Sequence, residues 1–418
     1  MKLSQFGEKF AGRSGIVELM DDLSYALSEN PQMIFMGGGN PARLAAVEEV
    51  FQRRLQEVLD DPEQRHQLFG VYQSPKGESE FCRQVAELLR REFGWQLSER
   101  NVAVSNGSQS AFFVLFNMFA GKQTDGSNKT IHLPVTPEYI GYSDIGVEAG
   151  MFSASRPTIE KIEHHLFKYH VDFSNLKLTS GIAALAASRP TNPTGNVLTD
   201  DEIASLDTLA REHDIPFILD GAYGLPFPGI LFNDATPFWN ENTILVLSLS
   251  KLGLPGTRTG IIVASEEIVE AYSRANTVLS LACGNFGPAI AKQLFASGEI
   301  LTIGRKTLAA FYQERAWQTL NWFRDAMSDL PCRIHTPEGA IFLWLWFEGM
   351  PISSMELYER LKSRGVLVVP GCQFFPGLED DWQHRQECIR VSYAQDPGSI
   401  KKGVQIIADE VRAAFLRG

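Results

Sequence analysis

The middle of the chain alternates between short apolar runs and longer segments with helical periodicity. The runs that predict strands are Asn101 to Ser105, Thr130 to Pro134, Gly181 to Ser188, Ile215 to Asp220, Thr243 to Leu249 and Gly260 to Ala264. Segments typical of helices follow two of them, at Ser108 to Ala120 and Asp200 to His213. This alternation predicts a mostly parallel sheet covered by helices, and functional residues in such sheets gather where strand carboxyl ends open into loops.

The last third of the chain has a different pattern. A long amphipathic stretch from Ile303 to Asp329 suits an interdomain helix. Beyond it we expect a small α+β domain, with strands and helices at Arg333 to Thr336, Ala340 to Phe347, Ser353 to Arg364, Cys388 to Tyr393 and Ser399 to Leu416. We therefore predict an N-terminal arm (residues 1–44) that joins the small domain, a large domain with a seven-stranded sheet (45–295), and an interdomain helix with the small domain (296–418).

Composition narrows the function classes. The 418 residues are 44% hydrophobic and 21% charged, with a net charge of −12, which argues against a nucleic-acid groove or an anionic membrane surface. No apolar run is long enough to span a bilayer, and the N-terminus has no signal-peptide pattern. The five cysteines form no CxxC pair and no zinc-like spacing, so we expect free thiols, no metal and a cytoplasmic location.

A lysine follows one of the apolar runs at the point where its strand should end. Lys251 comes directly after Thr243 to Ser250, and Gly253 to Gly256 then end the strand pattern. An amine at the end of a buried strand is a candidate for Schiff-base chemistry with a carbonyl cofactor, because partial burial lowers its pKa from about 10.4. The alternative is a surface lysine whose stem packs along the protein. Lys251 alone favours the alternative, and the rest of the chain reverses that preference.

Two loops after other predicted strands carry polar groups suited to a ligand. Asn106-Gly-Ser-Gln-Ser110 precedes a helix, where free N–H groups, hydroxyls and the helix dipole favour an anion; a simple N-cap by Ser108 is the alternative. In Ser188-Arg-Pro-Thr-Asn-Pro-Thr-Gly195 two prolines restrict the backbone around Asn192, so its amide can be directed. A strand-to-helix turn is the alternative for this second string.

Four further side chains extend the candidate site. Asp220 ends a predicted buried strand, with Tyr223 three residues later, and a buried carboxylate needs a partner such as a pyridinium N–H. A helix N-cap or a loop salt bridge is its alternative role. Tyr139 offers a flat face for stacking, or packs in a loop. Arg390, in a late strand, suits bidentate carboxylate recognition, or is an edge-strand charge.

One motif suggests a dinucleotide site and is rejected. Gly37-Gly-Gly-Asn-Pro-Ala42 fits G-x-G-x-x-A, but a dinucleotide site needs a second strand that ends in an acidic residue about 20 residues later. The region from Val58 to Glu63 is polar and has no strand pattern.

Taken together, the chain resembles the class I/II aminotransferases of fold type I, which use pyridoxal 5′-phosphate. The resemblance rests on the order and spacing, over essentially the whole chain, of Asn192, Asp220-x-x-Tyr223, Ser248-x-Ser-Lys251, Arg258 and Arg390. It implies an α/β fold-type I architecture, a homodimer, and amino transfer between an amino acid and a 2-oxo acid.

The resemblance implies a role for each matching residue. Lys251 would hold the cofactor as an imine and then move the substrate Cα proton, Asp220 would keep the pyridine nitrogen protonated, and Tyr223 would bond the phenolic oxygen. The other expected cofactor contacts are Gly107, Ser108, Gln109, Tyr139, Asn192, Ser248, Ser250, Arg258 and, across a subunit interface, Tyr72. The expected substrate contacts are Gly39, Asn192 and Arg390.

Longer strings narrow the resemblance. Pro226-Phe-Pro-Gly-Ile230 and Pro337-Glu-Gly-Ala-Ile-Phe-Leu-Trp-Leu-Trp346 are among those that imply exchange between valine or alanine and pyruvate or 2-oxoisovalerate. The apolar character around Gly15 to Met20 and at Phe374-Phe375 suits an aliphatic substrate. The alternatives are a carbon–sulfur β-lyase, an aminotransferase of other aliphatic or aromatic amino acids, and a cofactor-binding sensor domain, which would need a DNA-binding domain before Gly37.

Overall fold

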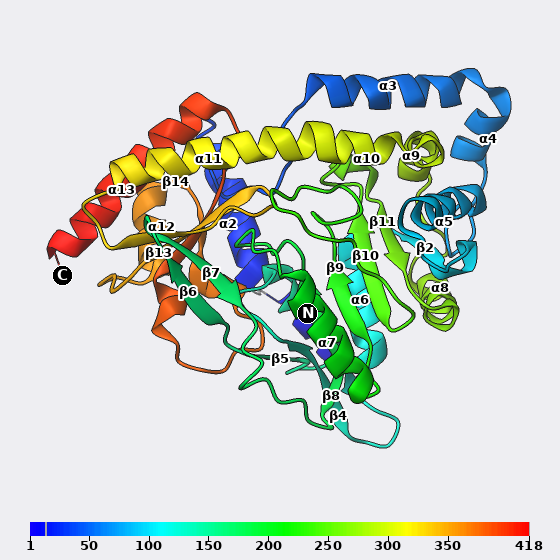
Figure 1. Cartoon of the computed structure of the whole chain (residues 1–418), viewed down its shortest axis with the longest axis horizontal. Helices are drawn as coiled ribbons and strands as arrows, with labels where there is room; N and C mark the ends of the chain where they lie inside the picture. Colours follow the sequence, from blue (N-terminus) through cyan, green and yellow to red (C-terminus); the bar gives the residue numbers. More distant parts are fainter. Residues whose placement is uncertain (13–14, 418) are drawn as a thin grey trace.

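A large mixed sheet forms the centre of the molecule in the computed structural model (Figure 1), which describes residues 1–12 and 15–417, without the side chains of 15, 16, 18 and 19. It has eight strands in the order β2-β11-β10-β9-β8-β4-β3, with β5 beside β4. Their bounds are β2 (Val102–Ser105), β3 (Gly121–Lys122), β4 (Asn128–Leu133), β5 (Phe152–Ala154), β8 (Ile182–Ser188), β9 (Phe217–Asp220), β10 (Thr243–Ser248) and β11 (Gly260–Val263).

The prediction of a mostly parallel sheet is confirmed. β4, β5, β8, β9 and β10 pair in parallel, whereas β11 and β3 run antiparallel to their neighbours. The sheet has one strand more than the seven expected, and the short strands β3 and β5 had no sequence signal. β5 is only three half-buried residues long, so it lacks the apolar run that marks the central strands.

The two faces of this sheet explain why its strands are continuous apolar runs. On β10, Ile244 and Val246 belong to one core, while Leu245 and Leu247 belong to the other. Helices α6 (Ser108–Phe119) and α8 (Glu266–Ser280) share the first core, and α5 (Ser79–Phe93), α7 (Asp200–Glu212) and α9 (Phe286–Ser297) share the second. Because helices cover both faces, successive residues of either orientation are buried.

A second sheet of six strands lies beside the first, in the order β15-β16-β13-β12-β7-β6. Its strands are β6 (Thr158–Ile162), β7 (Leu166–His170), β12 (Cys332–His335), β13 (Phe342–Phe347), β15 (Val369–Pro370) and β16 (Cys388–Ser392). Helices α12 (Ser354–Ser363) and α13 (Pro397–Arg417) accompany it. The division between 45–295 and 296–418 stays a prediction, yet β6 and β7 come from the first range and pair through β12 with the second.

A long helical segment connects the two sheets (Figure 1, yellow). It runs through α10 (Glu299–Thr302), a π-helical segment (Ile303–Leu308) and α11 (Ala309–Ala326), close to the predicted interdomain helix. At its start the backbone passes directly against another loop, since a Cβ on Gly304 would lie 2.3 Å from the Pro228 carbonyl oxygen. Helices α3 (Ala45–Asp60) and α4 (Pro62–Gly70) precede α5 in the chain (Figure 1, blue).

The N-terminal arm contacts both parts of the molecule. In α1 (Gln5–Ala11), Lys9 donates to the Glu148 carbonyl at 2.6 Å. In α2 (Gly15–Glu29), Asp22 accepts hydrogen bonds from Tyr358 and Lys362 of α12. The short strand β1 (Ile34–Phe35) then pairs with β14 (Val366–Leu367). None of the helices in the described ranges is long and apolar enough for a bilayer crossing.

Candidate active site

Four parallel strands of the large sheet end at one edge, and a predicted site residue lies at the end of each strand or shortly after it. β2 leads to Gly107, β8 to Asn192, β9 ends at Asp220 and β10 leads to Lys251. A cavity of about 540 Å³ opens there, and its lining also includes Val369 and Arg390 of the small sheet. That volume lies within the range of about 300–1,000 Å³ that is usual for small-molecule sites.

The amine of Lys251 lies inside this cavity. Its Nζ donates to the Gly39 carbonyl at 2.5 Å and lies 5.2 Å from the centroid of the Tyr223 ring. Burial, together with the cations Arg390 and Arg258, lowers the pKa of Lys251 to about 8. About a tenth of the amine is therefore uncharged at pH 7, far more than at the usual pKa of about 10.4, and the uncharged amine is the form that attacks a carbonyl carbon.

The carboxylate of Asp220 lies at the back of the same cavity. Its Oδ2 accepts from the Tyr142 hydroxyl at 2.7 Å, and its Oδ1 accepts from the Ala222 N–H at 2.8 Å. Burial raises the pKa of Asp220 to about 6, against the opposing effect of these two hydrogen bonds. Asp220 is thus negative at neutral pH in a buried place, where it would stabilise a cationic ring N–H.

One end of the cavity is suited to an anion. Gly107 is the N-cap of α6 with φ +87°, and a Cβ there would lie 2.4 Å from an Nη atom of Arg258. The first turn of α6 contains no acidic residue, so nothing opposes the positive end of the helix. Ser108, Ser248 and Ser250 add hydroxyl groups to the same lining. Free N–H groups, hydroxyls and a guanidinium are the groups that suit a phosphate.

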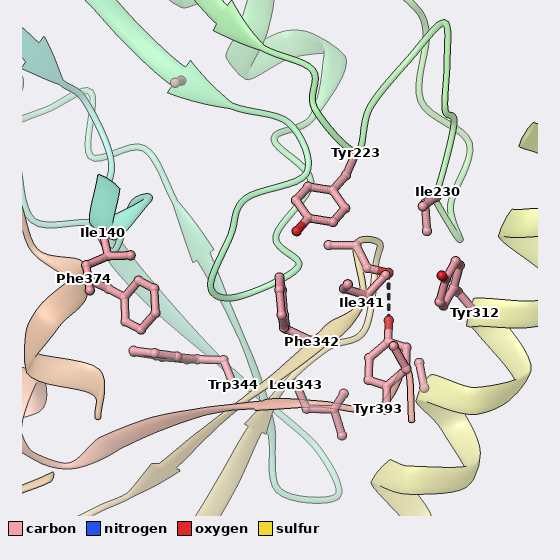
Figure 2. Close-up of a cluster of buried hydrophobic side chains, with 14 of the residues drawn as sticks. Ile140, Tyr223, Ile230, Tyr312, Ile341, Phe342, Leu343, Trp344, Phe374 and Tyr393 are labelled. Carbon is pink, nitrogen blue, oxygen red and sulfur yellow. Dashed lines mark hydrogen bonds between the residues drawn. The ribbon is translucent and has the colours of Figure 1, made fainter. Parts of the chain in front are cut away.

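Arg390 faces the cavity from the small sheet. Its two Nη atoms donate to Asn192 Oδ1 and to the Gly37 carbonyl, each at 2.7 Å. The guanidinium carbon lies 4.1 Å from the centroid of the Phe342 ring and 5.1 Å from that of Phe374, two rings drawn in Figure 2. Burial lowers the pKa of Arg390 to about 10, so the guanidinium still carries its charge at neutral pH.

The strand around Arg390 excludes its alternative role. β16 lies between β13 and β15, and Arg390 is only 5% exposed, so it is not an edge-strand charge. Its Nε is buried without a hydrogen-bond partner among the described residues. A buried cation with an unused donor, in a cavity that also holds Lys251, suits a carboxylate ligand.

The three glycines of the rejected dinucleotide motif lie at the same cavity. Gly37, Gly38 and Gly39 follow the short strand β1 and line the cavity. Two of their carbonyl groups accept hydrogen bonds, Gly37 from Arg390 and Gly39 from Lys251. A Cβ on Gly37 would lie 3.1 Å from the Val368 carbonyl, so glycine permits a close approach of two backbones.

Most of the side chains selected from the sequence meet in this one cavity. Its lining contains Gly39, Ser108, Gln109, Tyr139, Asn192, Asp220, Tyr223, Ser248, Ser250, Lys251, Arg258 and Arg390. Gly107 lies just behind, against Arg258. Tyr72 is the exception: it follows α4, is 85% exposed and does not line the cavity. Its role therefore stays a prediction that requires a second subunit.

Sequence reasoning missed two groups of residues, one that contacts Asp220 from outside the lining and one that lines the cavity. Tyr142 bonds Asp220 directly, but in the sequence it is only one of two tyrosines in a short string. Helix α2 contributes Met20, Leu23, Ser24 and Leu27. The sequence predicts that apolar side chains from Gly15 to Met20 face the substrate. Within this range the side chains of 15, 16, 18 and 19 lie outside the described residues. Periodicity identifies an apolar helix face but does not say which cavity it covers.

The described side chains contain no group of three or more His, Cys, Asp or Glu residues that could hold a metal ion. The chain is also similar to known proteins. Residues 31–407 match the model of the family described as aminotransferase class I and II. The chain belongs to this family.

Similar proteins narrow the comparison within the class I and II aminotransferases. The chain is 46% identical over 415 residues, or 99% of both chains, to the valine–pyruvate aminotransferase of Escherichia coli K12. A crystal structure of valine–pyruvate aminotransferase from Salmonella typhimurium LT2 superposes with a TM-score of 0.89 at 45% identity, covering 97% of this chain and all of that one. Thermus thermophilus aspartate aminotransferase has a TM-score of 0.77 at 20% identity, covering 98% of this chain and 100% of that one, and shows the shared fold.

Proposed function

We propose that this aminotransferase uses pyridoxal 5′-phosphate and exchanges an amino group between valine or alanine and pyruvate or 2-oxoisovalerate. The observation that carries the proposal is the convergence of Lys251, Asp220 and Arg390 on one cavity, in a chain that is 46% identical to a valine–pyruvate aminotransferase along its length. An amine nucleophile, a buried anion and a buried cation are the three groups that this chemistry needs.

The residues around the cavity fit this cofactor. The N-terminus of α6 with Gly107, Ser108, Ser248, Ser250 and Arg258 would hold the phosphate, with Gln109 beside them. Asp220 would face the ring nitrogen, Tyr139 would stack on the ring, and Asn192 and Tyr223 would bond its phenolic oxygen. The close approach of Arg258 to Gly107 supports the assignment, because it concentrates positive charge at the end where a phosphate would bind.

Lys251 has two tasks in the reaction. Its uncharged Nζ would hold the cofactor at its aldehyde carbon and, when free, would take the proton from the substrate Cα. Pyridoxal phosphate, when bound, would supply an electron-withdrawing ring that accepts the electron pair left at Cα. Asp220 would hold the proton on the ring nitrogen, which strengthens that withdrawal. The lowered pKa of Lys251, about 8, keeps the amine available for both tasks.

The other side of the cavity would bind the substrate. Arg390 would form a bidentate pair with the α-carboxylate, assisted by Asn192 and by the backbone near Gly39. Leu23 and Leu27 of α2 offer apolar contacts to an aliphatic side chain. A substrate with an acidic side chain would need another cation there, and the described lining supplies only Lys251, Arg258 and Arg390, each with a role already.

We also propose a homodimer in which Tyr72 reaches the cofactor phosphate of the other subunit. Large apolar side chains are exposed in two segments: Phe69, Val71 and Tyr72 at the end of α4 and just after it, and Val278, Leu279, Leu281 and Phe286 from the end of α8 to the start of α9. Phe69 and Phe286 join them, with ring centroids 5.9 Å apart. A contiguous apolar surface of this kind is typical of a protein–protein interface. Five free cysteines, four of them buried, support the cytoplasm as the location.

A visible spectrum of the purified protein tests the proposal. Valine should shift the absorption of the bound cofactor, and pyruvate should restore it, with release of 2-oxoisovalerate and alanine. A spectrum that ignores both compounds would contradict the assignment. A carbon–sulfur β-lyase would instead release pyruvate and a thiol from cystathionine without consuming a 2-oxo acid. A sensor domain would bind the cofactor and turn over neither substrate.

A further inference from the structure

A glutamate with no role in the chemistry above is completely buried behind the cofactor site. Glu138 is 0% exposed, directly before Tyr139 and the short 3₁₀ helix Ile140–Tyr142. Among the described residues it forms no ion pair with a lysine, arginine or histidine, although other buried acids such as Glu202 do. A buried carboxyl group without a cation is costly as an anion.

Glu138 instead binds one residue with both of its oxygens. Its Oε1 accepts from the Ser188 N–H at 2.7 Å, and its Oε2 lies 2.5 Å from the Ser188 hydroxyl. The Tyr139 N–H lies 3.2 Å from Oε2, and the Glu138 N–H donates to the Phe374 carbonyl at 2.8 Å. The side-chain carboxyl group of Glu138 is therefore held beside Ser188, the last residue of β8.

Ser188 and Tyr142 connect this carboxyl group to Asp220. Ser188 is paired with Asp220 in the register of β8 and β9. The Tyr142 hydroxyl donates to Asp220 Oδ2 at 2.7 Å. Burial and the charges of Asp220 and Glu138 raise the pKa of Tyr142 well above its usual value, and a hydrogen bond with Ser188 opposes this rise. Glu138, Ser188, Tyr142 and Asp220 thus form one buried group of polar side chains, and only Asp220 and Ser188 of the four line the cavity.

Two carboxylates in one buried group repel each other, so one of them has to be neutral. The titratable groups that face Glu138 are Asp220 of β9 and Tyr142, with Tyr139 adjacent in the chain. Burial, together with the charge of Asp220, raises the pKa of Glu138 to about 8, against the opposing effect of its hydrogen bonds to Ser188. The pKa of Asp220 is lower, at about 6, because Tyr142 and the Ala222 N–H stabilise its anion. Near neutral pH the proton is therefore on Glu138 and the charge is on Asp220.

We propose that Glu138 is a positioning residue that stays protonated and, through Ser188 and Tyr142, directs hydroxyl protons toward Asp220. When Glu138 is protonated, its carboxyl O–H would donate to Ser188 Oγ across the 2.5 Å contact between them. That would leave the hydroxyl proton of Ser188 free for Tyr142, which donates to Asp220. This inference rests on the proposed function in one respect: Asp220 is the partner of the ring nitrogen. If Glu138 were ionised, Ser188 would donate to Glu138 instead, and a second anion would weaken the ability of Asp220 to remain charged.

Infrared spectroscopy of the purified holoenzyme tests the protonation directly. At pH 7 the wild-type protein should show the C=O stretching band of a protonated carboxylic acid, shifted in ²H₂O. The band should disappear in Glu138→Gln, and in the wild type as the pH rises through about 8. Glu387→Gln is the matched control, because Glu387 is also buried and accepts hydrogen bonds, from Trp346 and Gly349 of the small domain. A wild type without the band, or a band that survives in Glu138→Gln, would overturn the proposal.

Variants separate a role in proton direction from a role in packing. Glu138→Ala should lower kcat at pH 7 about tenfold, as expected if the pKa of Asp220 rises from about 6 by about two units, and Glu138→Gln, which keeps a donor toward Ser188, should recover most of that loss. Ser188→Ala should lower kcat similarly while the infrared band of Glu138 remains, which keeps the test available if Glu138→Ala does not fold. Equal losses in Glu138→Ala and Glu138→Gln would refute the directed hydrogen bonds. If the band behaves as expected but valine and pyruvate are not converted, the proposed function fails and the protonation of Glu138 stands.

Discussion

The two sides of the cavity are built in different ways. On the large-sheet side, Asp220 ends β9, and Lys251 and Asn192 follow β10 and β8 within a few residues, so the hydrogen-bonded register of neighbouring strands sets their spacing. On the other side, Arg390 of β16 meets the glycines after β1, whose partner strand is β14. The first side is assembled by one sheet and the second by segments more than 300 residues apart in sequence, as the Arg390–Gly37 separation of 353 shows.

We expect this structural difference to correspond to a difference in function. The sheet edge would hold the cofactor, whose atoms need fixed partners, while the assembled side would hold substrates that enter and leave. Figure 2 shows the seam between the sides, where Tyr223 of the large sheet meets Phe342 of the small one, with ring centroids 5.9 Å apart. Substitutions on the sheet edge should therefore abolish the chemistry, whereas substitutions on the assembled side should change affinity and selectivity.

The largest effect is expected at Lys251. Lys251→Ala should lower kcat about 10⁴-fold or more, because one atom acts as both nucleophile and proton carrier. Borohydride treatment followed by mass spectrometry should find the cofactor attached at position 251 in the wild type and nowhere in the variant. Lys251→Arg is the matched control, since it keeps a cation but cannot act as the nucleophile. Cofactor attached to another lysine would contradict the role of Lys251 at the sheet edge.

A loss of about 10³-fold is expected for Asp220→Ala, within the range for removal of a preorganised charge at a reacting centre. The fold should survive, as circular dichroism can check, while the absorption of the bound cofactor changes because the ring nitrogen is no longer held protonated. Asp207→Ala is a suitable comparison: Asp207 is also buried but lies on α7 and pairs with Arg211. Turnover close to that of the wild type in Asp220→Ala would contradict the assignment.

On the assembled side, Arg390→Ala should lower kcat/KM for valine by roughly 30- to 5,000-fold, the equivalent of about 2–5 kcal/mol for a lost partner of a buried charge pair. The spectrum of the bound cofactor should stay intact. Arg390→Lys should recover little, since a lysine does not offer the planar pair of donors. Loss of cofactor binding in Arg390→Ala would mean that Arg390 binds the cofactor and not the substrate carboxylate.

The same contrast explains what the sequence could predict. Lys251, Asp220 and Asn192 follow apolar strands whose residues are continuous because both sheet faces are covered, so local pattern and position were enough. The pairing of the β6–β7 hairpin with β12 had no local signal, since Thr158 to Ile162 is partly exposed and the partner lies more than 150 residues later. The contact of Tyr142 with Asp220 and the place of α2 over the cavity depend on tertiary packing in the same way.

A pH effect should be visible in the uptake of the cofactor. The pKa of Lys251 is lowered from 10.5 to about 8, so its uncharged fraction rises as pH increases toward 8 and levels off above it. The rate at which cofactor-free protein captures pyridoxal phosphate should therefore fall about tenfold per pH unit below that value. Stopped-flow absorbance measures this rate, and Lys251→Ala provides the baseline. A rate that still rises steeply up to pH 10 would mean that the amine is not desolvated.

The smallest effect is expected on α2, where packing selects among similar substrates. Leu23 is buried and lines the cavity, so Leu23→Ala should enlarge the space for a side chain and shift the ratio of kcat/KM for leucine over valine about tenfold, since a methylene is worth about 1–3 kcal/mol in an apolar pocket. Tyr25→Ala is the control, because Tyr25 lies on the same helix and is exposed. A shift of equal size in both variants would mean that α2 acts through its stability; a shift in Leu23→Ala alone would show that the assembled side selects the substrate.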